Sequence, residues 1–256
     1  MKYSIPSYSF HGLFGEGKID LFGYLESVKY RYRLDSADIW NMMFVSYEED
    51  YLKKLREALD DKGMYVANLC VDAAEVWDVD PDARERFYQN GLSNLRAAQI
   101  LGAQTVRIDM GGRELAMTDE QFEYTVKVYK EYAQIAHDSG FKVGPENHWG
   151  ASRDPENIRK VVEAVDSPAF GILLHFDNWD VDKENGDALC AKYAFHTHLA
   201  AWVIPACEQK LGILRDAGYD GHLGIEHHSG RNEYSQVEWQ FATARNTWIN
   251  MNRAAQ

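Results

Sequence analysis

The sequence predicts an α/β fold, a single (β/α)8 barrel that spans residues 1–256. Short apolar segments alternate about eight times with longer segments of helical periodicity, as expected when helices join parallel strands. No turn of the Asn-Gly type directly joins two strand segments, so antiparallel hairpins are not expected. The length of 256 residues also fits one barrel, because the six prolines and nineteen glycines are scattered and form no linker.

A doubly wound open sheet is the alternative fold with the same order of elements. Such sheets often bind dinucleotides through a GxGxxG motif after the first strand. No such motif follows the first strand segment of this chain. The barrel is therefore the preferred prediction.

The first half of the chain provides four strands. They are expected at residues 3–10, 37–40, 64–71 and 105–110. Three helices are expected between them, at residues 20–33, 46–62 and 80–101. Asp20, Ser46 and Asp80 precede these helices as N-caps, and Gly63 and Gly102 follow the last two as C-caps.

The second half repeats the pattern with four further strands. Their sequences are FKVGPE, GILLHFD, YAFHTHL and GHLGIEH, between residues 141 and 227. Helices are expected at residues 118–139, 154–167, 207–217 and 234–250. Thr118 and Gln121 form a capping-box candidate before the first of these helices. The stretch between GILLHFD and YAFHTHL is too short and polar to give a clear helix signal.

The composition argues against several classes of partner. A net charge of −13 and an isoelectric point near 5.1 would repel the phosphates of nucleic acids and of anionic membranes. No run approaches the roughly 18 apolar residues of a membrane span. Cys70, Cys190 and Cys207 are far apart and lack CxxC spacing, which indicates reduced thiols in a cytoplasmic protein.

Ionisable residues end the last four strand segments. They are Glu146 and His148, His175 and Asp177, His196 and His198, and Glu226 and His228. Because side chains alternate along a strand, apolar neighbours such as Leu223 and Ile225 face the helices and these groups face the barrel interior. The same alternation points Arg107 and Asp109 inward. Many charges are therefore expected at the C-terminal mouth, where barrel enzymes place their active sites.

A divalent metal ion would explain this arrangement. Two glutamates that face one another in a barrel mouth repel strongly unless a cation or a shared proton lies between them. A metal-free network of Glu, His and Arg is the alternative. Arg107 is expected either to bind a substrate oxygen or to pair with Asp109, and Trp149, Trp179 and Trp202 either form a wall for a sugar ring or pack at the rim.

The order GPENHWG, GILLHFDNW, YAFHTHL and AGYDGHLGIEHH resembles the xylose isomerase-like TIM-barrel family of sugar phosphate isomerases and epimerases. The resemblance implies a divalent metal at the ends of strands five to eight. Glu146, His198 and Glu226 match the family's ligand positions. On strand six, counting from Gly171 gives His175 as the ligand, whereas a slip of two residues gives Asp177, and His175 is preferred.

The resemblance also implies the chemistry. The metal would be Mn²⁺ first, with Co²⁺, Zn²⁺ or Mg²⁺ as alternatives, and an imidazole ligand disfavours Mg²⁺. Proton abstraction next to the carbonyl of a sugar would give a metal-stabilised enediolate, with Glu146, Glu226 and His148 as catalytic groups. The expected substrate contacts are Asp177, Arg107, His196, His11 and Trp149. His198 is followed by Leu199 and Ala200 where family members often carry a lysine, which disfavours a phosphorylated substrate.

Two other functions remain open. The run ENHWG followed by SRDPENI is also similar to the catalytic subunits of C-glycoside deglycosidases, lyases that act on 3-keto glycosides together with a small β-rich partner subunit. A non-catalytic sugar-binding barrel is the alternative of another class, favoured by the altered ligand on strand six. A homo-oligomer is also compatible with the sequence. A metal-dependent endonuclease is disfavoured by the acidic charge and the incomplete histidine set.

Overall fold

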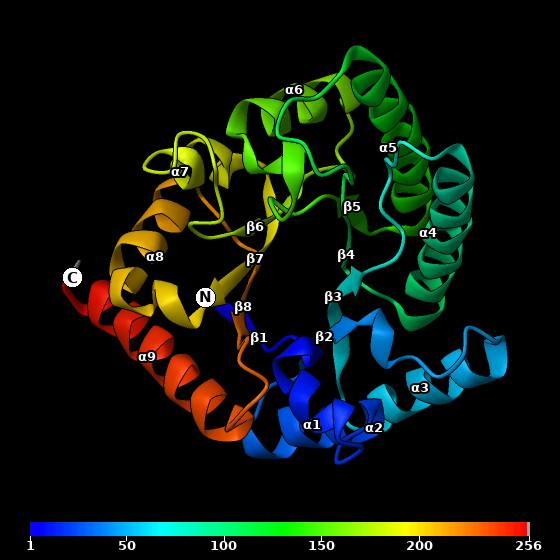
Figure 1. Ribbon diagram of the computed structural model, residues 1–256. Helices are drawn as coiled ribbons and strands as arrows, with labels where there is room; N and C mark the ends of the chain where they lie inside the picture. Colours follow the sequence, from blue (N-terminus) through cyan, green and yellow to red (C-terminus); the bar gives the residue numbers. More distant parts are fainter. Residues whose placement is uncertain (255–256) are drawn as a thin grey trace.

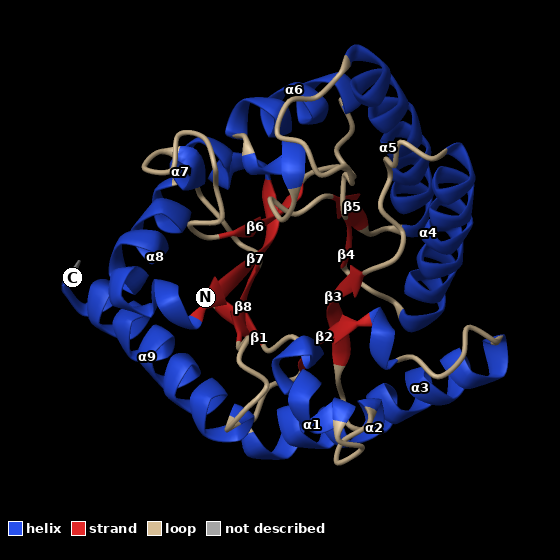
Figure 2. Ribbon diagram, viewed as in Figure 1, coloured by secondary structure: helices blue, strands red, loops and turns tan. Residues whose placement is uncertain are grey.

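The computed structural model describes residues 1–254, in which eight strands line a ring and helices surround it (Figure 1). All paired neighbours in the ring are parallel. Figure 2 shows the strands inside and the helices outside, which is the (β/α)8 arrangement that the sequence predicts. None of the helices in the described part of the chain is both long and apolar enough to cross a membrane.

The eight strands are short. They are β1 Lys2–Ser4, β2 Ser36–Trp40, β3 Tyr65–Val71, β4 Thr105–Ile108, β5 Lys142–Gly144, β6 Ile172–His175, β7 Ala194–Ala200 and β8 His222–Glu226. Apolar side chains on their outer face, such as Val106, Leu174 and Ile225, are fully buried against the helices. The predicted alternation along the strands is thus confirmed for the core.

Helices follow most of the strands. They are α1 His11–Gly15, α2 Leu21–Glu26, α3 Glu49–Asp61, α4 Pro81–Leu101, α5 Asp119–Ser139, α6 Pro155–Val165, α7 Gly186–Cys190, α8 Cys207–Asp216 and α9 Glu233–Ala254. A π-helical turn, Ser27–Arg31, extends α2, and short 3-10 turns occupy Ser7–Phe10, Asn41–Met43, Gly150–Arg153, Ala191–Tyr193 and Ala201–Ala206.

The caps of the two longest predicted helices are confirmed. The Asp80 side chain accepts a hydrogen bond from the Asp82 amide at the start of α4, and Gly102 ends that helix in the left-handed region with φ of 64°. Thr118 accepts from the Gln121 amide at the start of α5, and Gly140 ends it with φ of 79°. The predicted start of α3 at Ser46 is wrong, because Ser46 caps a turn at Glu48 and the helix begins at Glu49.

Several strand predictions are too long, and those for β1 and β5 change the position of site residues. The first strand stops at Ser4, and the chain forms a 3-10 turn after Pro6, so His11 begins α1 and does not lie in a loop. Strand β5 stops at Gly144, because Pro145 has no amide hydrogen to donate to a strand ladder. Glu146 therefore lies just beyond β5.

The ring consists of two four-stranded sheets, ordered β1-β8-β7-β6 and β2-β3-β4-β5. Between β5 and β6 they meet through the single bridges Val143–Phe170 and Glu146–Leu173, and near β1 and β2 through the bridge Pro6–Asp38. We call these two junctions the seams of the barrel. Side chains near the mouth contact one another across both seams, Glu146 with His175 at one and Asp38 with His196 at the other.

Candidate functional site

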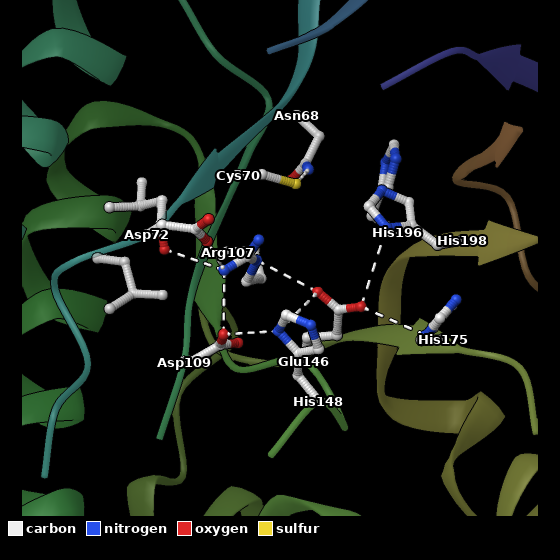
Figure 3. A network of polar contacts seen from close by, with 12 residues as sticks. Asn68, Cys70, Asp72, Arg107, Asp109, Glu146, His148, His175, His196 and His198 are labelled. Carbon is white, nitrogen blue, oxygen red and sulfur yellow. Dashed lines mark hydrogen bonds and ion pairs between the residues drawn. The ribbon is translucent and has the colours of Figure 1, made fainter. Parts of the chain in front are cut away.

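Four buried side chains from the last four strands meet at the mouth of the barrel. Glu146 follows β5, His175 ends β6, His198 lies in β7 and Glu226 ends β8. Each of the four residues is at most 8% exposed. Figure 3 shows Glu146 directed toward His175 and His198. We call these four residues the ligand cluster.

The two imidazoles of the ligand cluster lie between the two carboxylates. Glu146 Oε1 is 3.7 Å from His175 Nδ1 and 3.9 Å from His198 Nδ1. Glu226 Oε2 is 3.5 Å from His175 Nε2 and 3.4 Å from His198 Nδ1. The arrangement that the sequence predicts for Glu146, His175, His198 and Glu226 is therefore present.

Several atoms of the ligand cluster are buried without a hydrogen-bond partner. They are both ring nitrogens of His175, Nδ1 of His198 and Oε2 of Glu226. Buried polar atoms are nearly always partnered in native proteins, so a group of lone pairs around one point needs an explanation. Two carboxylates and two imidazoles form a donor set suited to Mn²⁺, Co²⁺ or Zn²⁺. The residues thus fit a divalent ion.

Two triads of potential ligands each share one residue with the ligand cluster. One is Asp38, His196 and His198, and another is Asp109, Glu146 and His148. Asp38 accepts hydrogen bonds from Ser4 and Asn68, and its Oδ2 lies 2.8 Å from His196 Nε2. Because these partners already occupy the Asp38 carboxylate, it supports the ligand cluster and is a poor ligand itself.

Arg107 fills the place of a cation in the second triad. Its Nη1 lies 2.8 Å from Asp72 and 3.0 Å from Asp109, and its Nε lies 3.3 Å from Glu146 Oε2 (Figure 3). Of the two expectations for Arg107, the structure thus shows the pairing with Asp109. The guanidinium would repel a second metal ion at this position.

Two residues support the histidines of the ligand cluster, one through a side chain and one through the backbone. Asp38 Oδ2 lies 3.4 Å from His198 Nε2, which leaves His198 Nδ1 to face the carboxylates. Burial would raise the pKa of Asp38, but His196 and His198 outweigh it and hold that pKa far below its usual value. Asn147 accepts from the His175 amide at 2.7 Å and donates to the His175 carbonyl at 2.8 Å, which fixes the end of β6.

His148 lies at the edge of the cluster with its Nδ1 2.9 Å from Asp109 Oδ2. Burial alone would lower the pKa of His148, but the carboxylates of Glu146 and Asp109 raise it to about 9. Burial raises the pKa of Glu146, whereas His198 and His228 overcome burial at Glu226 and lower its pKa. The two glutamates therefore have different electrostatic environments.

Two predicted site residues lie elsewhere. Asp177 does not face inward, because β6 ends at His175 and Asp177 has a left-handed φ of 60°. Its carboxylate pairs with Lys210 of α8. The expectation that Asp177 faces inward as an alternative ligand is therefore wrong, whereas a contact of Asp177 with a substrate stays a prediction. His196 is fully buried behind His198 and contacts Asp38, so it is not placed to touch a substrate.

The remaining predicted residues lie around the mouth. His11 is stacked on Tyr8, with ring centroids 4.6 Å apart, and Tyr8 lies edge-on to His228. Trp149 is 55% exposed, and its ring lies 4.2 Å from that of His148. Trp149 is therefore available to a ligand. The ring of Tyr8 lies between His11 and His228, so His11 does not contact the ligand cluster directly.

Several residues of the site were missed as functional candidates. Asp38, Asn147 and Asp72 support the ligand cluster or Arg107. His228, which was expected to face the barrel interior but was given no role, has its Nε2 3.3 Å from Glu226 Oε2. The inward parity of Asp38 in the segment ADIW could have identified it. The role of Asn147 could not be inferred, because it depends on how two loops meet.

A pocket of about 990 Å³ opens beside His148. Its walls come from helix α4 and from the loops after β3, β4 and β5, and include Trp77, Val79, Phe87, Leu115 and Trp149. Asp72 and His148 line it on the side of the ligand cluster. A ligand in the pocket would therefore reach the edge of the cluster.

A family model described as xylose isomerase-like TIM barrel matches residues 32–246. The matched residues include strands β2 to β8 and all four members of the ligand cluster. No curated protein matches the chain in sequence.

Three solved structures illustrate the fold that the chain shares. D-psicose 3-epimerase with D-tagatose from Clostridium cellulolyticum H10 is 16% identical with a TM-score of 0.78, over 96% of this chain and 99% of that one. 3-Keto-D-glucoside 4-epimerase from E. coli is 13% identical with a TM-score of 0.69, over 94% and 98%. A probable 3-DHS dehydratase from Bacillus anthracis is 14% identical with a TM-score of 0.71, over 94% and 98%. At these identities the likeness concerns the fold.

Proposed function

The chain belongs to the xylose isomerase-like TIM-barrel family, and we propose that it is a divalent-metal-dependent isomerase or epimerase of sugars. The observation that carries this proposal is the set of buried, unpartnered atoms on His175, His198 and Glu226. The names of two structural relatives, D-psicose 3-epimerase and 3-keto-D-glucoside 4-epimerase, support the choice of reaction.

Glu146, His175, His198 and Glu226 would hold the ion. When bound, a divalent cation would polarise the carbonyl and hydroxyl oxygens of a sugar and stabilise negative charge that develops on them. Mn²⁺ fits this mixed set of oxygen and nitrogen donors, and the second imidazole makes Mg²⁺ a weaker candidate.

The protein groups would move the proton. A carboxylate oxygen of Glu146 or Glu226 takes the proton from the carbon next to the carbonyl. In an isomerase the carboxyl group so formed returns the proton to the neighbouring carbon. In an epimerase the first glutamate keeps that proton, and the other glutamate, protonated beforehand, delivers its own proton to the opposite face of the same carbon. Arg107 holds the Glu146 carboxylate in place through its 3.3 Å contact. Asp109 binds Nδ1 of His148, which leaves Nε2 of that ring to exchange a proton with a substrate oxygen.

Deuterium exchange tests this proposal. The protein loaded with Mn²⁺ is incubated in D₂O with a panel of ketoses and 3-keto glycosides, and nuclear magnetic resonance follows both deuterium uptake at the carbon next to the carbonyl and the product formed. We expect exchange with at least one substrate and none after chelation. Absence of exchange across the panel by a protein that binds Mn²⁺ would favour a non-catalytic sugar-binding barrel.

The same assay separates isomerisation from elimination. A lyase would begin with the same proton removal and then release the substituent of a 3-keto glycoside, so its products differ from those of an epimerase. A small β-rich partner would be needed only in the lyase alternative. Size-exclusion chromatography with light scattering would show whether the chain forms a homo-oligomer.

A further inference from the structure

His228 adds a third imidazole beside the ligand cluster. It lies in the loop after β8, two residues beyond Glu226, and its Nε2 is 3.3 Å from Glu226 Oε2. The same oxygen is 3.5 Å from His175 Nε2 and 3.4 Å from His198 Nδ1. One carboxylate oxygen therefore has three ring nitrogens around it at nearly equal distances.

These distances match the spacing of atoms that bind one metal ion. Ligand atoms at roughly 2.0–2.1 Å from a tetrahedral ion lie about 3.3–3.4 Å from one another. Potential ligand atoms of His175, Glu226 and His228 also all lie within 4.8 Å of one another. His228 thus has the position of a ligand, although it is not among the four ligands that the family resemblance implies.

Hydrogen bonds do not explain the contacts of Glu226. Its Oε2 is buried and has no hydrogen-bond partner among residues 1–254, although the three ring nitrogens lie within 3.5 Å. None of these nitrogens is therefore aligned to donate a proton to that oxygen. Buried polar atoms are nearly always partnered, so an ion shared by the oxygen and the nitrogens explains the arrangement better.

Aromatic rings fix the position of the His228 imidazole. It stacks on His175, with ring centroids 5.7 Å apart and an angle of 25° between the planes. The ring centroid of Trp202 lies 4.6 Å away, and that of Tyr8 lies 5.7 Å away in an edge-on arrangement. An imidazole packed against three rings has little freedom left to lose when it binds an ion.

The residue before it directs His228 toward the mouth. The His227 amide donates to Ser9 Oγ at 3.0 Å, and His227 Nδ1 lies 3.4 Å from Gln240 Nε2 of α9. His227 is therefore buried on the outer side of the barrel wall. Because successive side chains of an extended chain point to opposite sides, His228 faces Glu226.

We propose that His228 is a fifth protein ligand of the divalent ion and binds it through Nε2. This inference rests on the proposed function only for the presence of an ion at the ligand cluster, and not for the reaction. The donor set is then three imidazoles and two carboxylates. Because imidazole suits Co²⁺ and Zn²⁺ whereas carboxylate suits Mn²⁺ and Mg²⁺, His228 shifts the preference of the site toward the first pair.

Proton nuclear magnetic resonance of the Co²⁺-loaded protein counts the imidazole ligands. Each imidazole bound to the ion keeps one N–H group, whose signal is strongly shifted by the unpaired electrons of Co²⁺ and disappears in D₂O. We expect three such signals in the wild type and two in His228→Gln. The same number of signals in the two proteins, or no binding of Co²⁺, would overturn the inference.

His148 offers a matched control. It follows Glu146 by two residues, as His228 follows Glu226, and the side chains of His148 and His228 are 27% and 29% exposed. Its Nδ1 is already engaged by Asp109 at 2.9 Å. We expect H228Q to weaken Co²⁺ binding about tenfold or more and Mn²⁺ binding less, and His148→Gln to weaken neither. A smaller loss of Co²⁺ affinity in H228Q, or an equal loss in H148Q, contradicts the role of His228 as a ligand.

These measurements do not depend on turnover. Three shifted signals from a protein that shows no deuterium exchange with sugars would support His228 as a ligand and refute the isomerase. Exchange by a protein whose signals are the same with and without His228 would refute the ligand and leave the isomerase in place.

Discussion

Two groups of charged residues, each with buried members, lie near the mouth of the barrel, and they differ in how their polar atoms are paired. The ligand cluster leaves atoms of His175, His198 and Glu226 without partners. In the second group, Lys210 pairs with Asp177 and, at 2.8 Å, with Asp187, which also accepts from Trp179 Nε1 at 2.7 Å. We call Asp177, Lys210, Asp187 and Trp179 the lysine cluster.

The difference teaches that burial of charge alone does not identify a site. Both groups bury carboxylates, yet the lysine cluster has its own cation and a complete set of hydrogen bonds, as expected of a structural ion pair. The ligand cluster has two carboxylates and two imidazoles without such a closed set. Removal of one charge should therefore impair chemistry in the ligand cluster and stability in the lysine cluster.

The largest expected effect is that of Glu146→Gln. This change should reduce turnover by about 10³-fold and weaken Mn²⁺ binding, because it removes an anionic ligand and a candidate base. The metal-free protein should lose little stability, since Arg107 keeps its contacts with Asp72 and Asp109. Kinetic assay, metal analysis and calorimetry measure the three quantities. His222→Gln, at the opposite end of β8, is the control that should retain metal.

Asp187→Asn should have the opposite profile. Removal of the carboxylate leaves Lys210 buried without its full charge partner, which typically costs about 3 kcal/mol of stability. Metal content at 20 °C should stay the same as in the wild type. Urea unfolding gives the stability, and Asp60→Asn in the exposed pair with Arg56 serves as the control with little effect. If D187N lost metal without losing stability, the lysine cluster would belong to the site.

Metal addition should stabilise the protein through the ligand cluster alone. Mn²⁺ at about 100 times its dissociation constant should add about 2.7 kcal/mol to the free energy of unfolding. The gain should persist in D187N and be largely absent in E146Q. Thermal denaturation with and without Mn²⁺ checks this, and Mg²⁺ should give a smaller shift at equal concentration. An equal gain in E146Q would place the ion elsewhere.

Asp38→Asn should weaken metal binding less than Glu146→Gln does. The carboxylate orients His198 from behind without belonging to the ligand cluster, and such supporting groups typically contribute roughly 10- to 100-fold in affinity. A competition assay with a metal-sensitive dye measures the change. A loss as large as that in E146Q would instead make Asp38 a ligand, as its triad with His196 and His198 allows.

The sequence predicted most of the fold because local chemistry decides it. Asp80 with Pro81 and Gly102 mark both ends of α4, and Thr118 and Gly140 those of α5. The same reasoning failed at Asp177, where a single left-handed residue after β6 turns the side chain toward α8. Strand alternation holds only as long as the strand continues.

The positions of the four residues of the ligand cluster were also predictable from the sequence. Their positions at strand ends predicted that four residues would meet, namely Glu146, His175, His198 and Glu226. In the structure each of the two carboxylates lies within 4 Å of both imidazoles. The pocket beside His148 was not predictable, because it depends on the pairing of Trp77 with Met110 and Gly112 in loops without a sequence signature. Loop pairing of this kind is a long-range property.

The two seams give the ligand cluster a mechanical role. Glu146 follows β5 of one sheet, whereas His175, His198 and Glu226 belong to strands of the other sheet. Only isolated bridges join the two sheets between β5 and β6. Asp38 reaches across the other seam to His196. An ion held by all four residues would link the two sheets. Metal binding would therefore reduce local opening between β5 and β6 and slow the exchange of their amide hydrogens.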